Sequence, residues 1–209
     1  MTFQKIVCFA VLVSCVLVFA YSLGLMTDIY DSLYSAFDPE LFDPELDLDT
    51  IPTESLAAFG VYVPGADIYY DMQPFNSTFT KVGIVMIVVS LVLFVTNTHS
   101  RRKYYIGNYI AVAVVSICNI ACVIWLWPQI MAFKAQYLGI DFAKLKEFTE
   151  SPRGATARYT DSTFWFDVSY FVFGVVILSV VLLIANLVLK ILLMKAEKNT
   201  VGTRKGVGA

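Results

Sequence analysis

Residues 168–189 read VSYFVFGVVILSVVLLIANLVL, a stretch without a single charged side chain. A bilayer hydrocarbon core about 30 Å thick is crossed by roughly 20 helical residues, each rising 1.5 Å. Similar apolar runs occupy residues 6–25, about 79–95 and 106–130. Because lipid offers the backbone no hydrogen-bond partners, runs of this kind must be helical. The sequence therefore predicts four membrane-spanning helices.

Composition agrees with this interpretation. Hydrophobic residues make up 58% of the 209 residues, and the mean hydropathy is +0.69. A soluble domain has about 45–50% apolar residues. The predicted fold class is an all-α membrane protein, a four-transmembrane-helix bundle with short extracytoplasmic helices in two outer loops.

The distribution of cations predicts the orientation. Arg101, Arg102 and Lys103 fill the short link between the second and third runs, whereas residues 27–80 contain no Lys or Arg. By the positive-inside rule, both termini and this link lie in the cytoplasm. We also expect the protein to lie in the cell (plasma) membrane. We expect the basic link to contact anionic lipid headgroups. Five cations in the second outer segment oppose this orientation: Lys134, Lys144, Lys146, Arg153 and Arg158.

These runs and charges divide the chain into successive segments. The predicted segments are a first transmembrane helix (1–26), an acidic extracytoplasmic loop (27–78), a second helix (79–98), a basic cytoplasmic link (99–105), a third helix (106–133), a second extracytoplasmic loop (134–163), a fourth helix (164–194) and a basic cytoplasmic tail (195–209).

The first run has two alternative interpretations. Lys5 followed by an apolar stretch ending near Ala20 could be a cleaved signal peptide, and residues 12–15 (LVSC) resemble a bacterial lipobox. The apolar stretch continues past both cleavage points as far as Met26. This favours an uncleaved anchor, because a mature N-terminus is usually polar.

Residues 37–49 read FDPELFDPELDLD, in which the acidic unit FDPEL occurs twice in tandem and is followed by further acidic residues. Carboxylates interleaved with apolar anchors are typical of a recognition surface. We expect this repeat to bind a partner protein through Asp38, Glu40, Phe42, Asp43, Glu45, Asp47 and Asp49. Two alternatives stay open. The repeat could be an internal lid that pairs with the cations of the second loop, or Asp43, Glu45, Asp47 and Asp49 could bind a divalent cation weakly.

Shorter local patterns predict structure within the two loops. Pro64-Gly65 indicates a turn. Asp141, Phe142, Leu145 and Phe148 have the spacing of an amphipathic helix, which residues 151–154 (SPRG) would end.

Four small polar residues lie near the middle of the apolar runs, one on each: Ser14, Ser90, Asn119 and Ser179. We expect them to form interhelical hydrogen bonds, each worth about 0.6 kcal/mol; a polar pore lining is the alternative. Asn186 and Gln129 are expected to find partners among their neighbours or at the interface. The runs carry no charge near their centres, whereas ion-coupled carriers normally need one.

Cysteine positions restrict the chemistry. Cys8, Cys15, Cys118 and Cys122 all fall in apolar runs, so the outer loops cannot form disulfides. Cys118 and Cys122 are i, i+4 and could ligate a metal, but small packing residues are the favoured interpretation. The sequence shows no catalytic motif, and we predict no enzyme activity, cofactor, metal site or nucleic-acid binding. If the protein were a membrane enzyme, its catalytic groups would have to be carboxylates on the outer face, such as Asp67, Asp71, Asp161 and Asp167.

In outline, the predicted topology resembles that of claudin-like and other tetraspan proteins. The Trp and paired-Cys signature of claudin first loops is absent, as is the Cys-Cys-Gly motif of tetraspanins. We therefore transfer no function or residue from either family. The expected function is that of a non-enzymatic membrane accessory or assembly subunit that contacts a partner protein through its outer loops; the alternative is a component of a channel or transporter.

Overall fold

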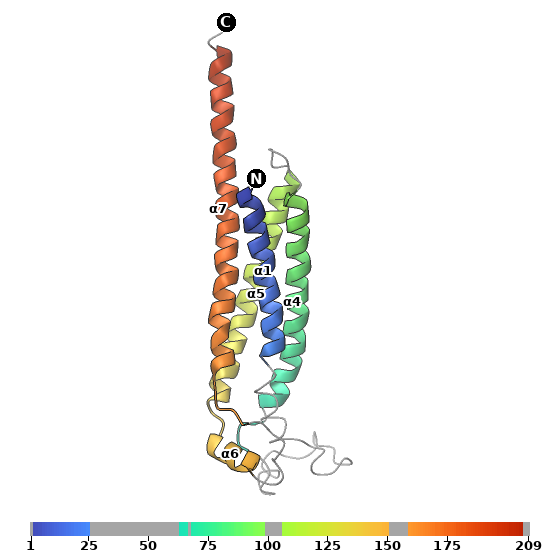
Figure 1. Cartoon of the computed structure of the whole chain (residues 1–209), viewed down its shortest axis with the longest axis vertical. Coiled ribbons are helices and arrows are strands. Elements are labelled where there is room, and N and C mark those ends of the chain that lie inside the picture. Colours follow the sequence, from blue (N-terminus) through green and yellow to red (C-terminus); the bar gives the residue numbers. More distant parts are fainter. Residues whose placement is uncertain (1, 26–62, 67, 99–105, 151–158, 207–209) are drawn as a thin grey trace. The chain divides into compact units, whose positions relative to one another are not determined.

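The structure, a computed structural model, describes residues 2–25, 63–66, 68–98, 106–150 and 159–206. These residues are all-helical in their regular structure (Figure 1). The helices are α1 (Thr2–Gly24), α4 (Ile68–Thr98), α5 (Ile106–Tyr137), α6 (Phe142–Glu150) and α7 (Phe164–Gly206). Four of them contain stretches long and apolar enough to cross a membrane: Phe3–Gly24, Asp71–Asn97, Asn108–Tyr137 and Phe164–Ala196.

Helix α4 begins at Ile68, inside the segment predicted to be the first outer loop (27–78). Its first turns are amphipathic: Ile68, Tyr69, Met72, Phe75 and Phe79 are all buried. That spacing is one face of an α-helix. Hydropathy alone did not reveal it because polar residues fill the other face, and Pro74 lies inside the helix.

Two other helices also extend past their predicted ends. Helix α5 continues to Tyr137 rather than residue 133, and the Tyr137 side chain is buried. Helix α7 starts at Phe164, the predicted position, but runs on to Gly206 instead of ending near residue 194. The residues past the apolar run include Leu, Met, Lys, Ala and Glu, which are good helix formers. An apolar run therefore marks the part of a helix that lies in lipid and not its ends.

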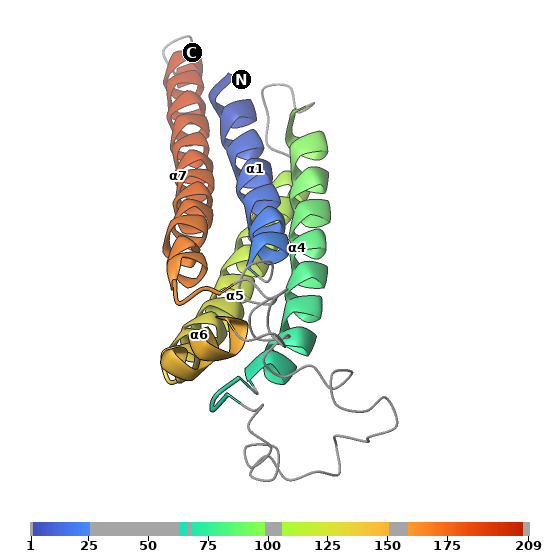
Figure 2. The ribbon, with the colours of Figure 1, turned by 60° about the horizontal axis from the view of Figure 1, so that its bottom comes forward.

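The chain divides into two compact units, which we describe separately. The first unit consists of Met1–Val18, Val82–Ile124 and Phe171–Ala209. Within it, segments of α1, α4, α5 and α7 lie side by side (Figures 1 and 2). Its core contains Val11, Met86 and Phe173, all fully buried. The rings of Phe9 and Phe94 join α1 to α4 with centroids 6.1 Å apart.

The second unit consists of Phe19–Lys81 and Trp125–Tyr170. Its described core is rich in aromatic rings. Phe75 of α4 packs on Phe133 of α5 with centroids 5.0 Å apart. Tyr137 of α5 packs on Phe166 of α7 with centroids 5.3 Å apart. Helix α6 belongs to this unit, where the spacing of Phe142 and Leu145 predicted it.

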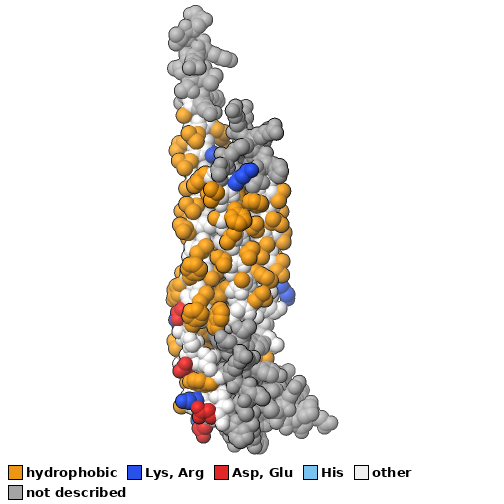
Figure 3. All heavy atoms as spheres, in the orientation of Figure 1, with side chains coloured by type: hydrophobic (Ala, Val, Ile, Leu, Met, Phe, Trp, Pro, Cys, Tyr) orange, Lys and Arg blue, Asp and Glu red, His pale blue; other side chains and the backbone are white. Residues whose placement is uncertain are grey.

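Large apolar side chains are exposed along the helices. Ile117, Ile124 and Phe171 are 68%, 68% and 67% exposed. The face in Figure 3 is covered by hydrophobic side chains along the helices. Soluble monomers rarely expose apolar surface so extensively, whereas such surface is favourable in lipid.

Candidate functional sites

A cluster of five buried residues, which we call the central polar cluster, brings together one or more residues from each spanning helix of the first unit. Its members are Ser14, Cys15, Ser90, Asn119 and Ser179. The Ser14 and Ser179 hydroxyl oxygens are 3.1 Å apart. The Cys15 sulfur lies 3.1 Å from the Ser90 hydroxyl, and the thiol donates to Asn119 Oδ1 over 3.6 Å. The four residues singled out from the sequence therefore meet around Ser14 and Cys15 of α1.

Cys15 was not among the polar residues singled out from the sequence, although the structure places its thiol between Ser90 and Asn119. A clue was available: Cys15 follows Ser14 directly and lies near the middle of the same run. Every member of the cluster is a neutral donor or acceptor, and none is more than 3% exposed. Such a group can join helices or hold a small polar ligand; it contains no acid or base for proton transfer at neutral pH.

Buried amides form a second polar feature of the first unit. Gln4 Nε2 of α1 donates to the Asn97 carbonyl oxygen of α4 over 3.1 Å and lies 3.3 Å from Asn97 Oδ1. In contrast, the side-chain nitrogens of Asn108, Asn119 and Asn186 are buried without a hydrogen-bond partner, as is the Ser116 hydroxyl. The expectation that neighbours satisfy Asn186 was therefore wrong for its nitrogen. Gln129 does have a partner, the Trp125 carbonyl oxygen at 2.8 Å.

The second unit contains a structured region beside its spanning helices, which we call the cap: residues 63–66, 138–150 and 159–163. Gly65 has φ +89°, as the predicted Pro64-Gly65 turn requires, and a Cβ there would lie 3.1 Å from Ile140 Cα. The Asp141 backbone nitrogen donates to the Pro64 carbonyl oxygen over 3.2 Å. These contacts fix the turn against the corner between α5 and α6.

Further contacts hold residues 159–163 in the cap. The Tyr137 hydroxyl donates to the Thr160 carbonyl oxygen over 3.0 Å. The Phe164 backbone nitrogen donates to the Ser162 hydroxyl over 3.2 Å, an interaction typical of a helix N-cap. On α6, Leu145 is buried, as is Ile140 just before the helix, whereas the α6 side chains of Lys144, Lys146, Glu147 and Glu150 are exposed.

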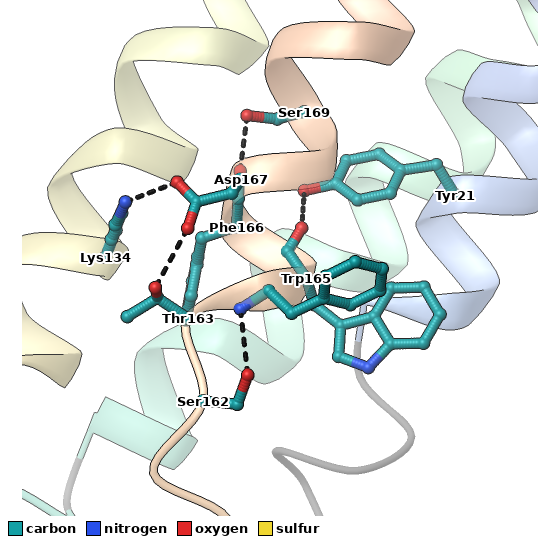
Figure 4. Close-up of polar contacts among 9 residues, drawn as sticks. Tyr21, Lys134, Ser162, Thr163, Trp165, Phe166, Asp167 and Ser169 are labelled. Atoms are coloured by element: carbon teal, nitrogen blue, oxygen red, sulfur yellow. Dashed lines mark hydrogen bonds and ion pairs between the residues drawn. The ribbon is translucent and has the colours of Figure 1, made fainter.

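An ion pair anchors the start of α7 (Figure 4). Lys134 of α5 pairs with Asp167, which also accepts a hydrogen bond from the Thr163 hydroxyl over 2.9 Å. The Tyr21 hydroxyl of α1 donates to the Trp165 carbonyl oxygen over 2.8 Å. Asp167, one of the carboxylates on which an enzymatic interpretation would depend, is thus engaged in a structural contact.

Several predicted residues lie outside the described part of the chain. They include the acidic repeat with Asp38, Glu40, Phe42, Asp43, Glu45, Asp47 and Asp49, the basic link with Arg101, Arg102 and Lys103, and Asp67, Arg153 and Arg158. Among the described residues, no group of three or more His, Cys, Asp or Glu side chains is placed to hold a metal ion.

Together, the four helices long and apolar enough to span a membrane and the exposed apolar side chains indicate a multi-pass helical membrane protein. Comparison with protein-family models, curated proteins and solved structures found no match.

Proposed function

We propose that this protein is a non-enzymatic integral membrane accessory or assembly subunit with tetraspan topology. Both termini lie in the cytoplasm, the cap faces the outside of the cell membrane, and the cap and the acidic repeat contact a partner protein. Arg101, Arg102 and Lys103 contact anionic lipid at the opposite interface.

The cap is the observation that carries this proposal. Its segments are far apart in the sequence and belong to two different loops, yet the hydrogen bond from Asp141 to Pro64 joins the two loops, and Tyr137 of α5 bonds to Thr160. Loops that only connect helices need no such fixing. A surface ordered in advance loses less conformational entropy when a partner binds.

Charge on α6 supports the same interpretation. The exposed side chains of Lys144, Lys146, Glu147 and Glu150 present both signs on one short helix whose opposite side is anchored by Leu145. Lys146 and Glu150 are only loosely paired, at 3.9 Å, and both are well exposed. Charges of this kind at an interface set partner choice and association rate.

Site-specific photo-crosslinking tests the proposal. A photoreactive amino acid replaces exposed Lys144 in the cap or, as a control, Ile84, which is 48% exposed on the spanning part of α4. We expect a discrete protein adduct from position 144 and lipid adducts from position 84. The adduct should be the protein that co-purifies with the tagged full chain in mild detergent.

A second variant distinguishes docking from an internal lid. Changing Asp38, Asp43, Asp47 and Asp49 together to Asn removes charge and nearly keeps shape. Loss of the co-purifying protein with unchanged thermal stability supports docking, whereas a lowered melting temperature of the isolated chain supports the lid. If neither changes and position 144 gives no protein adduct, the proposed function is wrong.

A component of a channel or transporter is the second candidate, and the central polar cluster favours it, because one level of the first unit collects polar groups from α1, α4, α5 and α7. Asn119→Leu tests this alternative in proteoliposomes. A folded variant that loses an ion or solute flux seen with the wild type would place transport ahead of the accessory role.

A further inference from the structure

The unpartnered polar atoms of the first unit are the starting point. The side-chain nitrogens of Asn108, Asn119 and Asn186 and the hydroxyl oxygen of Ser116 are buried without a partner, and these residues are 0–8% exposed. A polar atom that has lost its water without gaining a hydrogen bond is costly, and lipid cannot supply one. Four such atoms in one unit call for a common ligand.

Three of these residues share one face of α5. Asn108, Ser116 and Asn119 follow each other at i, i+8 and i+11, which a period of 3.6 residues places in one stripe. This stripe is the buried face of α5 in the first unit, where Val112 and Val115 are also buried.

The direction of the stripe follows from the connections. The hydrogen bond of Gln4 to Asn97 places the start of α1 beside the end of α4. The short link between α4 and α5 places Asn108 at the same end. Cys15, bonded to Ser90 and Asn119, marks the other limit of the stripe. One end therefore contains the buried amides Gln4, Asn97 and Asn108, and the other is the central polar cluster.

Asn186 of α7 lies at a level between Asn108 and Ser116 of α5. It comes seven residues after Ser179, which is level with Ser14, so it lies roughly 10 Å along the α7 axis from the central polar cluster. Helix α7 runs antiparallel to α1 (Figure 1), so this displacement is toward the start of α1. The same distance from Asn119 on α5 reaches the level of Val112, between Asn108 and Ser116. Along the helix axes, the four residues thus follow one another at steps of about one helical turn, roughly 5 Å.

Water fits these steps. A water molecule bonded at about 2.8 Å to one group on each side bridges about 4.5 Å at its tetrahedral angle and up to about 5.6 Å. It accepts from an amide nitrogen and both donates to and accepts from a hydroxyl, so one species serves all four residues. An ion without its hydration shell would meet only neutral side chains here. Buried water, in contrast, typically makes two to four hydrogen bonds to polar groups.

We propose that the first unit holds a file of ordered water molecules, which enters beside Gln4, Asn97 and Asn108 and ends at Asn119 in the central polar cluster. The file gives partners to Asn108, Asn186, Ser116 and Asn119 in turn. It does not depend on the proposed function, because an accessory subunit and a transport component could both contain it.

Water-edited solid-state NMR of the full chain in lipid bilayers tests this inference. The method measures the transfer of magnetisation from water protons to nearby nitrogens, here in protein labelled with ¹⁵N asparagine and methionine. We expect transfer to the side-chain nitrogens of Asn119 and Asn186 as fast as to solvent-exposed groups. The backbone nitrogen of Met86, a fully buried residue of the same unit, is the control and should receive it much more slowly. Slow transfer to both asparagines would show a dry interior and overturn the proposal.

A matched pair of variants tests where the file enters. Asn108→Leu removes the polar group at the entrance, whereas Ala113→Leu adds the same side chain at an exposed position of the same helix. We expect Asn108→Leu to slow the transfer to Asn119 several-fold and Ala113→Leu to leave it unchanged. An unchanged rate in folded Asn108→Leu would refute the path; if that variant does not fold, the wild-type measurement still decides between a wet and a dry interior.

Discussion

Replacing Gly65 by alanine should destabilise the second unit through two separate effects. First, its φ of +89° lies in the left-handed region, where a residue with a Cβ loses about 1–2 kcal/mol. Second, the new Cβ would lie 3.1 Å from Ile140 Cα and 3.2 Å from Ile140 Cγ1, and the Cα belongs to the backbone and cannot rotate away. Overpacking of this kind costs typically 1–3 kcal/mol. We therefore expect Gly65→Ala to lower the free energy of unfolding by about 2–5 kcal/mol.

The assay is reversible unfolding of the purified chain in detergent, with Gly174→Ala as the matched control. Gly174 lies within α7, and a Cβ there would meet nothing within 4 Å. Since alanine is the better helix former by about 1 kcal/mol, the control should be neutral or stabilising. Surface substitutions usually change the free energy of unfolding by no more than about 0.5 kcal/mol. If Gly65→Ala changes it by no more than this, the turn is not held against Ile140 as described.

Three further predictions concern individual contacts. Ser14→Ala and Ser179→Ala in a double-mutant cycle should give a coupling energy of about 0.6 kcal/mol, and additive effects would show that the two hydroxyls do not interact. Tyr137→Phe removes the hydrogen bond to Thr160 and should cost about 1 kcal/mol, whereas Tyr170→Phe, at a residue that is 53% exposed, should change little; equal effects on unfolding would argue against the contact. Lys134→Met leaves Asp167 without its cation and should lower the melting temperature, and adding Asp167→Asn should restore part of the loss; no recovery would mean that the loss does not come from the unpaired Asp167 charge.

The spanning helices were predictable because lipid imposes a simple rule: a long uncharged run must be a helix. The same rule does not fix helix ends. Residues 68–78 were assigned to a loop because they are polar in composition, although the spacing of Met72, Phe75 and Phe79 contains the helical period. The end of α7 was placed near residue 194 for a similar reason, where hydropathy falls although helix propensity does not.

The polar residues were predictable singly but not as a network. Ser14, Ser90, Asn119 and Ser179 stood out because each lies near the middle of a run. Which of them would meet depends on helix rotation and register, and these are set by packing across the bundle. For that reason the contacts of Cys15 with Ser90 and Asn119, and the lack of a partner for the Asn186 amide nitrogen, could not be identified from the sequence. The cap also depends on long-range contacts, although its turn and α6 were predicted.

The proposed orientation, with the cap outside and both termini in the cytoplasm, is the central claim, because docking through the cap requires it. Single cysteines at Lys144 on α6 and at Lys195 near the end of the α7 span test it, in a background lacking the four native cysteines. Both positions are exposed, so burial does not limit the reaction. We predict that a membrane-impermeant thiol reagent added to intact cells labels position 144 and that position 195 is labelled only after the membrane is opened. Labelling of both positions in intact cells, or of position 195 alone, would contradict the orientation and the docking function that depends on it.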